Sequence, residues 1–154
     1  MGRIITSVTI ENVAEPSKSI RCDALVDTGA SHLVLPKAWM DRLGLNRMQE
    51  LGVETATQQV VTGDLCGPAK IQIEGFRAIY NEVLFVDMQP ADGFYEPLLG
   101  YLVLEQSGAA VDILGHRLLH VKHMDLKRAC RYSSRSLLTS VTTSRTAAIT
   151  TPGT

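Results

Sequence analysis

The chain has 154 residues, of which 45% are hydrophobic and 20% are charged, and its formal net charge is −1. This length and composition fit one soluble globular domain and leave little room for a second. Because there is no basic excess, we expect no nucleic-acid partner, and because no apolar run is long enough to span a bilayer, we expect no membrane segment. The low aromatic content of 5% predicts an aliphatic core and favours β structure.

The number and spacing of the cysteines indicate in which cellular compartment the protein is expected. Cys22, Cys66 and Cys130 are odd in number, are widely spaced and form no C-x-x-C pair. The N-terminal sequence MGRIITSVTIENV has no apolar segment typical of a secretory signal. We therefore expect free thiols in a reducing compartment and a cytoplasmic protein.

The first part of the chain reads as short strands and one short helix. Residues 4–10 and 20–26 are rich in β-branched and apolar residues and predict two strands, with the turn formers of ENVAEPSKS between them. A short strand at 32–35 follows. Pro36 and Gly44 then bracket KAWMDRL, as expected for a helix of two turns.

The middle of the chain continues with β-like segments. Residues 53–62 and 65–74 form two of these, and the stretch 71–87 predicts two strands joined at a Glu-Gly turn. Residues 88–97 contain two prolines and a glycine among polar residues and predict a loop.

The last structured part predicts a short helix that ends at Gly108 and two strands, at 109–113 and 117–121. From about residue 131 the chain is dominated by Ser and Thr without an apolar face, which predicts a solvated, disordered tail. We therefore expect a domain over residues 1–128 and a tail over 129–154. Short strands with one or two short helices indicate an all-β barrel or sandwich.

One turn in this pattern carries a carboxylate between two apolar strands. The sequence CDALVDTGASHLVLP spans residues 22–36 and places Asp27-Thr28-Gly29-Ala30 at its centre. A charged group flanked by this much apolar sequence is costly unless something uses it. The alternative is that Asp27 only caps its own backbone in an Asx-turn.

A second element is the sequence PLLGYLVL, in which Leu98-Leu99-Gly100 leads into the predicted helix. Together with the Asp27 turn, it resembles the retropepsins, the single-lobe aspartic proteases of retroviruses and their cellular and bacterial relatives, over about residues 4–122. The resemblance implies a closed β-barrel with a flap hairpin. It also implies an aspartic endopeptidase that needs neither a metal nor a cofactor.

The resemblance also implies roles for individual residues. Asp27 is the catalytic carboxylate, and because the chain has one Asp-Thr-Gly turn, a homodimer would supply the second carboxylate and act on a peptide or protein substrate. Ser31 stands where retroviral members usually have Asp, which bears on substrate preference. The supporting residues that the resemblance implies are Thr28, Gly29 and Ala30 in the turn, Leu98, Leu99 and Gly100 packed behind it, and Thr57, Gln58 and Gln59 at the tip of the flap.

Three alternatives come from other classes. The same fold could serve as a non-catalytic peptide-binding or dimerisation module. His116, His120 and His123 have spacings that could place them on one helix face for a metal, but their surroundings are β-like and lack a carboxylate in register. Cys66 could be a nucleophile, but no His or Asn neighbour can be assigned to it, so a buried thiol is favoured.

Overall fold

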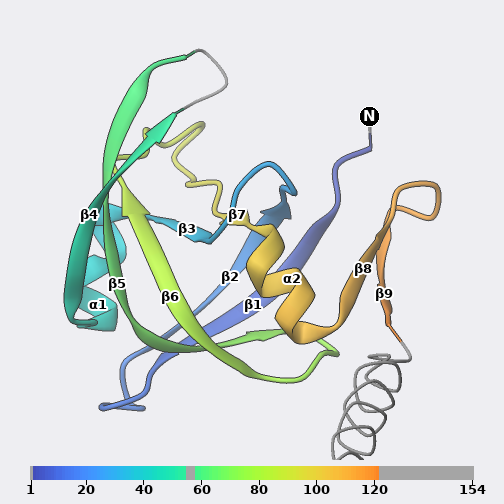
Figure 1. The fold of residues 1–154 in the computed structure, drawn as a ribbon, viewed down its shortest axis with the longest axis horizontal. Coiled ribbons are helices and arrows are strands. Elements are labelled where there is room, and N and C mark those ends of the chain that lie inside the picture. The colour runs from blue at the N-terminus through green and yellow to red at the C-terminus, as the bar shows by residue number, and fades with distance from the viewer. Residues whose placement is uncertain (1, 55–57, 122–154) are drawn as a thin grey trace, which may run out of the picture. The chain divides into compact units, whose positions relative to one another are not determined.

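The first two strands form on either side of the ENVAEPSKS turn, as predicted. β1 (Ile5–Asn12) and β2 (Ser19–Val26) pair antiparallel, with Ile5 opposite Leu25. The computed structural model describes residues 2–54 and 58–121 (Figure 1). The predicted domain boundary at residue 128 and the predicted tail lie outside these residues.

Six strands close into a barrel, which confirms the predicted fold class. The sheet runs in the order β1-β2-β7-β3-β6-β5, and a second pairing of β1 with β5 closes it. β4 continues the sheet beyond β5. The remaining strands of this sheet are β3 (Leu33–Pro36), β4 (Arg47–Glu54), β5 (Val60–Ile73), β6 (Ile79–Val86) and β7 (Leu98–Leu99).

Aliphatic side chains fill the barrel, as the low aromatic content predicted. In β1 and in the second half of β5, from Pro68 to Ile73, buried positions alternate with exposed or partly exposed ones, which is the two-residue period of a strand with one buried face. β3 is buried along its whole length because strands pair with it on both sides. The fully buried core includes Val8, Ile10, Leu33, Leu35, Ile71, Ile73, Val83, Phe85 and Leu99.

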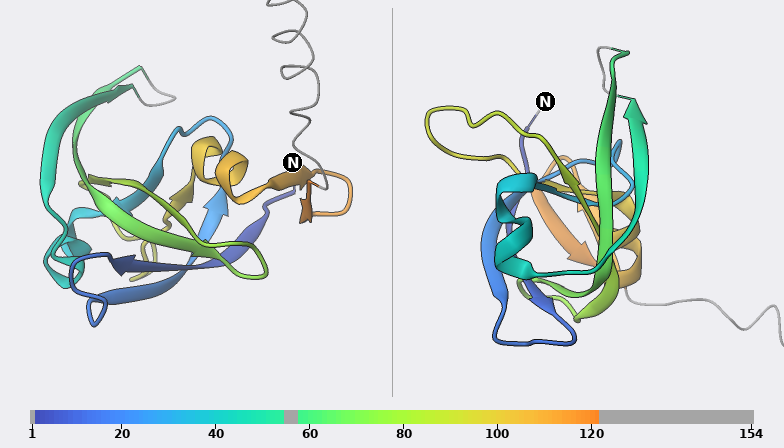
Figure 2. Two further views of the ribbon diagram at one scale, coloured as in Figure 1. Left: turned by 60° about the horizontal axis from the view of Figure 1, so that its bottom comes forward. Right: turned by 90° about the vertical axis from the view of Figure 1, so that its left-hand side faces the viewer.

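The β4–β5 hairpin differs from the strands predicted for this region. The segment predicted as one strand over 53–62 contains the turn between β4 and β5, and β4 begins six residues earlier. Its start, RMQE, is exposed on both faces and so has no apolar alternation. β5 also runs without a break through Gly63-Asp64, between the predicted segments 53–62 and 65–74, and its register against β6 shifts between Cys66 and Ala69. Figure 2 shows this hairpin projecting beyond the rest of the barrel.

The two short helices end at the glycines that the sequence indicated. A 3-10 turn, η1 (Lys37–Trp39), leads into α1 (Met40–Leu43), so the predicted two-turn helix is only partly α-helical. Gly44 and Gly108 close α1 and α2 (Tyr101–Ser107) in the left-handed conformation. The chain then forms the hairpin of β8 (Ala109–Asp112) and β9 (Arg117–His120), as predicted. None of the described helices is long and apolar enough to cross a membrane.

Candidate active site

The Asp27 turn is held by its own backbone. Asp27 follows the last residue of β2, and its N–H donates to the Leu99 carbonyl at 3.1 Å. The Ala30 N–H donates to the Asp27 carbonyl at 3.2 Å, and the Gly29 N–H donates to Asp27 Oδ1 at 2.9 Å. A Cβ at Gly29 would lie 3.1 Å from the same oxygen, so glycine lets the backbone approach the carboxylate closely. The carboxylate is thus oriented by the turn, and its side chain is only half-buried.

The second predicted element lies directly behind this turn. β7 pairs parallel with β2 and antiparallel with β3, which places Leu98 and Leu99 between the strands that enter and leave the turn. The N–H groups of Tyr101 and Leu102, at the start of α2, donate to the Ala30 and Ser31 carbonyls at 2.9 and 3.1 Å. Two motifs about 70 residues apart in sequence are therefore joined by backbone hydrogen bonds.

Gly100 makes this junction possible. Its own Cβ, if it had one, would lie 2.6 Å from the carbonyl carbon and oxygen of Ser31 and would overlap the His32 carbonyl oxygen. All three are backbone atoms, so no side chain can move aside. The close approach of the helix start to the turn therefore requires glycine at this position.

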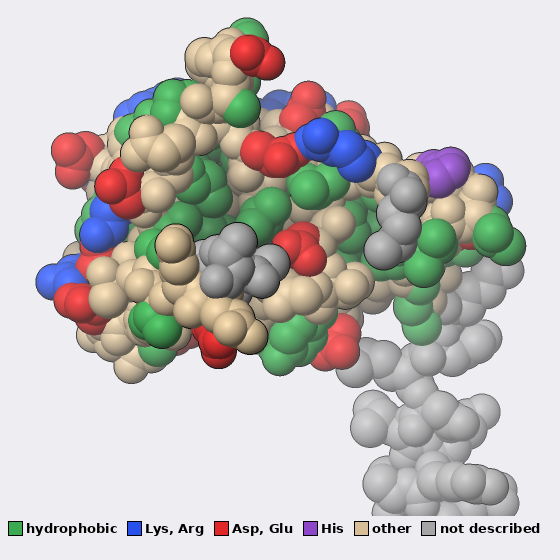
Figure 3. Space-filling model, turned by 90° about the horizontal axis from the view of Figure 1, so that it is seen from above, with side chains coloured by type: hydrophobic (Ala, Val, Ile, Leu, Met, Phe, Trp, Pro, Cys, Tyr) green, Lys and Arg blue, Asp and Glu red, His purple; other side chains and the backbone are tan. Residues whose placement is uncertain are grey.

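A pocket of about 280 Å³ lies between the turn and the β4–β5 hairpin. The turn lines one side of the pocket with the small residues 29–31, and the hairpin and β6 contribute apolar side chains. Figure 3 shows the molecule from above, with hydrophobic side chains gathered in a hollow. Concave, mostly apolar spaces of this kind are typical of ligand-binding sites. The residues that line it are Gly29, Ala30, Ser31, His32, Val34, Leu51, Gly52, Val53, Glu54 and Leu84.

The predicted flap coincides with the end of the β4–β5 hairpin. Glu54 pairs with Val60, so the turn lies between them. Gln58 and Gln59 are exposed there, and Gln58 has a positive φ of 60°. Thr57 lies outside the described residues. The structure thus places two of the three predicted flap residues at the hairpin end.

His32 was not among the predicted site residues, yet it lines the pocket. Its Nδ1 lies 2.8 Å from the Ser31 hydroxyl, and its Nε2 lies 3.7 Å from a Glu82 carboxylate oxygen. The sequence shows that His32 follows the Asp27-Thr28-Gly29-Ala30 turn by two residues, which is the signal that could have found it. The sequence does not show that His32 meets Glu82 on β6, because the two residues are 50 positions apart.

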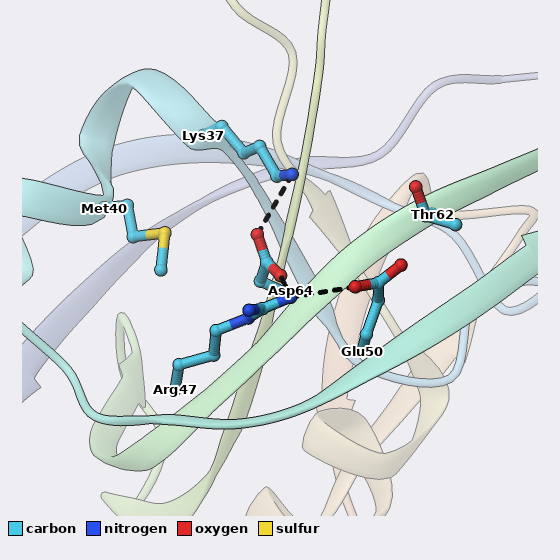
Figure 4. Close-up of a pocket in the computed structure, with 6 residues that line it drawn as sticks. All are labelled: Lys37, Met40, Arg47, Glu50, Thr62 and Asp64. Carbon is cyan, nitrogen blue, oxygen red and sulfur yellow. Dashed lines mark hydrogen bonds and ion pairs between the residues drawn. The ribbon is translucent and has the colours of Figure 1, made fainter.

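A second pocket, of about 370 Å³, lies where the hairpin joins the barrel (Figure 4). The Asp64 carboxylate, 8% exposed as a residue, accepts from Lys37 Nζ at 3.0 Å and from Arg47 Nη2 at 2.6 Å. Arg47 also contacts Glu50 at 2.9 Å. The Lys37 hydrogen bond and the positive charge of Arg47 hold the pKa of Asp64 below its usual value, against the opposing effect of burial. The cluster ties β4 and β5 to the start of η1.

The lowered pKa of Asp64 predicts a pH-dependent contribution to stability. The ionised carboxylate stabilises the fold fully above its ordinary pKa of about 3.9, and this contribution is lost as pH falls through the lower folded-state pKa. Asp64→Asn should therefore lower the melting temperature at about pH 7, and the difference from the unmodified protein should shrink below about pH 4. Thermal unfolding across pH measures this.

Asp41→Asn, at an exposed carboxylate of α1, is the control for this experiment and should change little at either pH. A difference between Asp64→Asn and the unmodified chain that is the same at both pH values would contradict the assignment.

The residues of the two alternative chemistries, the histidines and Cys66, have other surroundings in the described part of the chain. His116 lies in the turn between β8 and β9, and His120 stacks on Phe76 with ring centroids 4.2 Å apart. His123 lies outside the described residues, and no group of three His, Cys, Asp or Glu able to hold a metal occurs within residues 2–54 and 58–121. Cys66 is fully buried, and burial together with the Asp64 charge raises the pKa of its thiol, which disfavours a nucleophilic role.

Comparison with known proteins agrees with the geometry. A model of the family described as "gag-polyprotein putative aspartyl protease" matches residues 18–106, which include the Asp27 turn and Leu98-Leu99-Gly100. Among solved structures, the EIAV protease complexed with the inhibitor HBY-793 is similar, with 25% identity and a TM-score of 0.51. The match covers 73% of this chain and 94% of that one. A search of curated proteins gave no match.

Proposed function

Because the chain belongs to the gag-polyprotein aspartyl protease family, we propose that it is an aspartic endopeptidase that acts as a homodimer, with one Asp27 from each subunit at the site. The observation that carries this proposal is the oriented Asp27 carboxylate on a turn bonded to Leu99 and α2, beside an apolar pocket. The chain has one Asp-Thr-Gly turn, and a symmetric pair of chains supplies two.

The chemistry follows from two carboxylates held close together. Two like charges at short range cannot both persist cheaply, so the pair shares one proton. The ionised Asp27 removes a proton from a bound water, which attacks the peptide carbonyl carbon. The protonated Asp27 donates to the carbonyl oxygen, and a proton then passes to the departing amine nitrogen. No covalent intermediate with the protein forms.

The other predicted residues would support this reaction. The Gly29 N–H holds one oxygen of Asp27, which leaves the other directed to the reacting atoms. Thr28 is exposed at the turn and would brace the two turns against each other across the dimer axis. The β4–β5 hairpin would cover the bound peptide, and the pocket beneath it would take an apolar side chain next to the scissile bond.

The test is cleavage of a mixed peptide library from about pH 4 to 7, at several protein concentrations. When monomers dominate, an about tenfold dilution should lower the rate about a hundredfold, because the active species contains two chains. A statine-type mimic of the tetrahedral intermediate should inhibit cleavage, and a chelator should not.

The outcomes separate the classes of function. A folded dimer that cleaves nothing at any pH would indicate the non-catalytic peptide-binding module instead. Activity that the chelator removes would indicate a metal-dependent hydrolase.

A further inference from the structure

A third pocket, of about 310 Å³, lies on the outer side of the barrel, and we call it the loop pocket. β1 and β2 turn their even-numbered side chains into the core, so their odd-numbered side chains form the floor of the pocket. The segment between β6 and β7, an open loop in the right-hand view of Figure 2, forms its wall. The residues that line the loop pocket are Arg3, Ile5, Asp23, Leu25, Ala91, Phe94, Tyr95 and Glu96.

The wall of the loop pocket is fixed by its own contacts. Ala91 and Phe94 exchange two backbone hydrogen bonds of 2.9 Å around Asp92-Gly93. Both central residues have a positive φ, of 51° and 81°, as in the type I′ turn of a tight hairpin. Tyr95 packs edge-on against Trp39, with ring centroids 5.9 Å apart. The loop pocket is therefore largely formed before a ligand binds.

Two pockets flank the candidate catalytic carboxylate along the chain. Leu25, on the floor of the loop pocket, precedes Asp27 by two residues, and its N–H donates to the Pro97 carbonyl at 2.8 Å. Gly29, in the pocket between the turn and the β4–β5 hairpin, follows Asp27 by two residues. A peptide bound across Asp27 would therefore reach both pockets.

The charges that line the loop pocket favour a cation. Arg3 forms an ion pair with Glu96, so its positive charge is already matched. Asp23 accepts a hydrogen bond from the Ser7 hydroxyl at 2.6 Å, and within residues 2–54 and 58–121 no cation pairs with it. The lining thus carries two carboxylates and one guanidinium, which is a net charge of −1. An acidic side chain would be repelled here, and a basic one attracted.

The apolar part of the lining suits a long side chain with a charged end. Ile5 is 56% exposed and Phe94 is 79% exposed, so both the floor and the wall present apolar surface to solvent. The methylene groups of a lysine or arginine side chain cover such surface while the charged end stays among polar groups. The rings of Phe94 and Tyr95 would add an attraction between the cation and an aromatic face.

From these observations we propose that the loop pocket selects peptides with an arginine or lysine side chain close to the scissile bond, and that Asp23 sets this preference. The proposal rests on the proposed function and names its class of substrate. The guanidinium or ammonium group would pair with the Asp23 carboxylate, while the methylene groups lie against Ile5 and Phe94.

The experiment uses a peptide that the unmodified chain cleaves, with each position near the scissile bond replaced in turn by arginine or by citrulline. Citrulline has the shape of arginine without its charge, so the ratio of the two kcat/KM values reports the charge alone. Asp23→Asn is the test variant, because the Ser7 hydroxyl can still donate to the amide oxygen. Asp92→Asn is the matched control, because it removes an exposed carboxylate of the wall that does not line the pocket.

At one of these positions we expect kcat/KM to be about tenfold higher for the arginine peptide than for the citrulline peptide. Asp23→Asn should bring this ratio close to one and leave the citrulline value unchanged, and Asp92→Asn should leave the ratio unchanged. Circular dichroism checks the fold. If Asp23→Asn does not fold, the unmodified chain is measured at about 0.05 and 0.5 M salt, where the ratio should fall at the higher concentration.

Three results would overturn the proposal and leave the protease assignment standing. The first is equal cleavage of the arginine and citrulline peptides at every position. The second is a preference for arginine that persists in a folded Asp23→Asn chain. The third, where that variant does not fold, is a ratio that salt does not change.

Binding separates the loop pocket from the proposed function if no peptide is cleaved. Two library pools, one with a fixed arginine and one with a fixed citrulline, are then titrated into the unmodified chain by calorimetry. Tighter binding of the arginine pool that is lost in Asp23→Asn would support the pocket, and the protease assignment alone would fail. Equal binding of the two pools, or no binding, would overturn both.

Discussion

Asp27→Asn should lower the rate of peptide cleavage by about 10³-fold while leaving the protein folded and dimeric. The amide cannot take a proton from water, so neither subunit supplies the general base. The Gly29 N–H can still donate to the amide oxygen, and the rest of the turn is held by backbone bonds, so the change is local. Cleavage of a fixed peptide, measured beside circular dichroism and sedimentation, tests this.

Asp41→Asn is the matched control, because Asp41 is an exposed carboxylate on α1 outside the Asp27 turn. Mixing Asp27→Asn chains with unmodified chains tests directly whether two chains share one active site. An excess of Asp27→Asn chains should inhibit the unmodified protein, because most unmodified chains then sit in mixed dimers. Full activity in such a mixture, once exchange is complete, would mean that one chain holds a whole active site.

Gly100→Ala should destabilise the fold by about 3 kcal/mol, a large effect for one methyl group. The added Cβ would lie 2.6 Å from the Ser31 carbonyl and overlap the carbonyl of His32, so the turn and α2 must move apart. The melting temperature should fall by roughly 10 °C. Cleavage should also fall at temperatures where the variant is still folded, because the hydrogen bonds of Tyr101 and Leu102 to the turn lengthen.

Gly52→Ala is the comparison for stability. A Cβ at Gly52 meets its nearest neighbour, a Val60 methyl, at an ordinary 3.4 Å, and its φ lies outside the left-handed region. Its melting temperature should stay close to that of the unmodified chain. A Gly100→Ala variant as stable as Gly52→Ala would show that the turn and helix tolerate separation.

The sequence predicted well the elements whose formation depends on residues close together in the chain. The ends of α1 and α2 follow from Gly44 and Gly108, which adopt the left-handed conformation that glycine favours. β1, β2 and β6 follow from apolar residues on a covered face. The Asp27 turn and Leu98-Leu99-Gly100 could be paired from sequence through a family resemblance, and the structure joins them by hydrogen bonds.

β4 could not be predicted, because its first residues are exposed on both faces and carry no periodic signal. β5 was divided between the predicted segments 53–62 and 65–74, with a break at Gly63-Asp64, whereas pairing with β4 and β6 makes Val60–Ile73 one strand. In both cases strand pairing outweighed the local pattern.

The sequence by itself thus determined the fold class, the carboxylate turn and its family. Only the tertiary structure decided which groups meet at the pocket, at Asp64 and on the hairpin. Lys37, Arg47 and Asp64 come from three separate elements, and His32, just before β3, meets Glu82 on β6. The exposure of Leu119 and Val121 depends on which side of the β8–β9 hairpin packs on the core. These contacts join residues far apart in the chain, and no local preference of either partner encodes them.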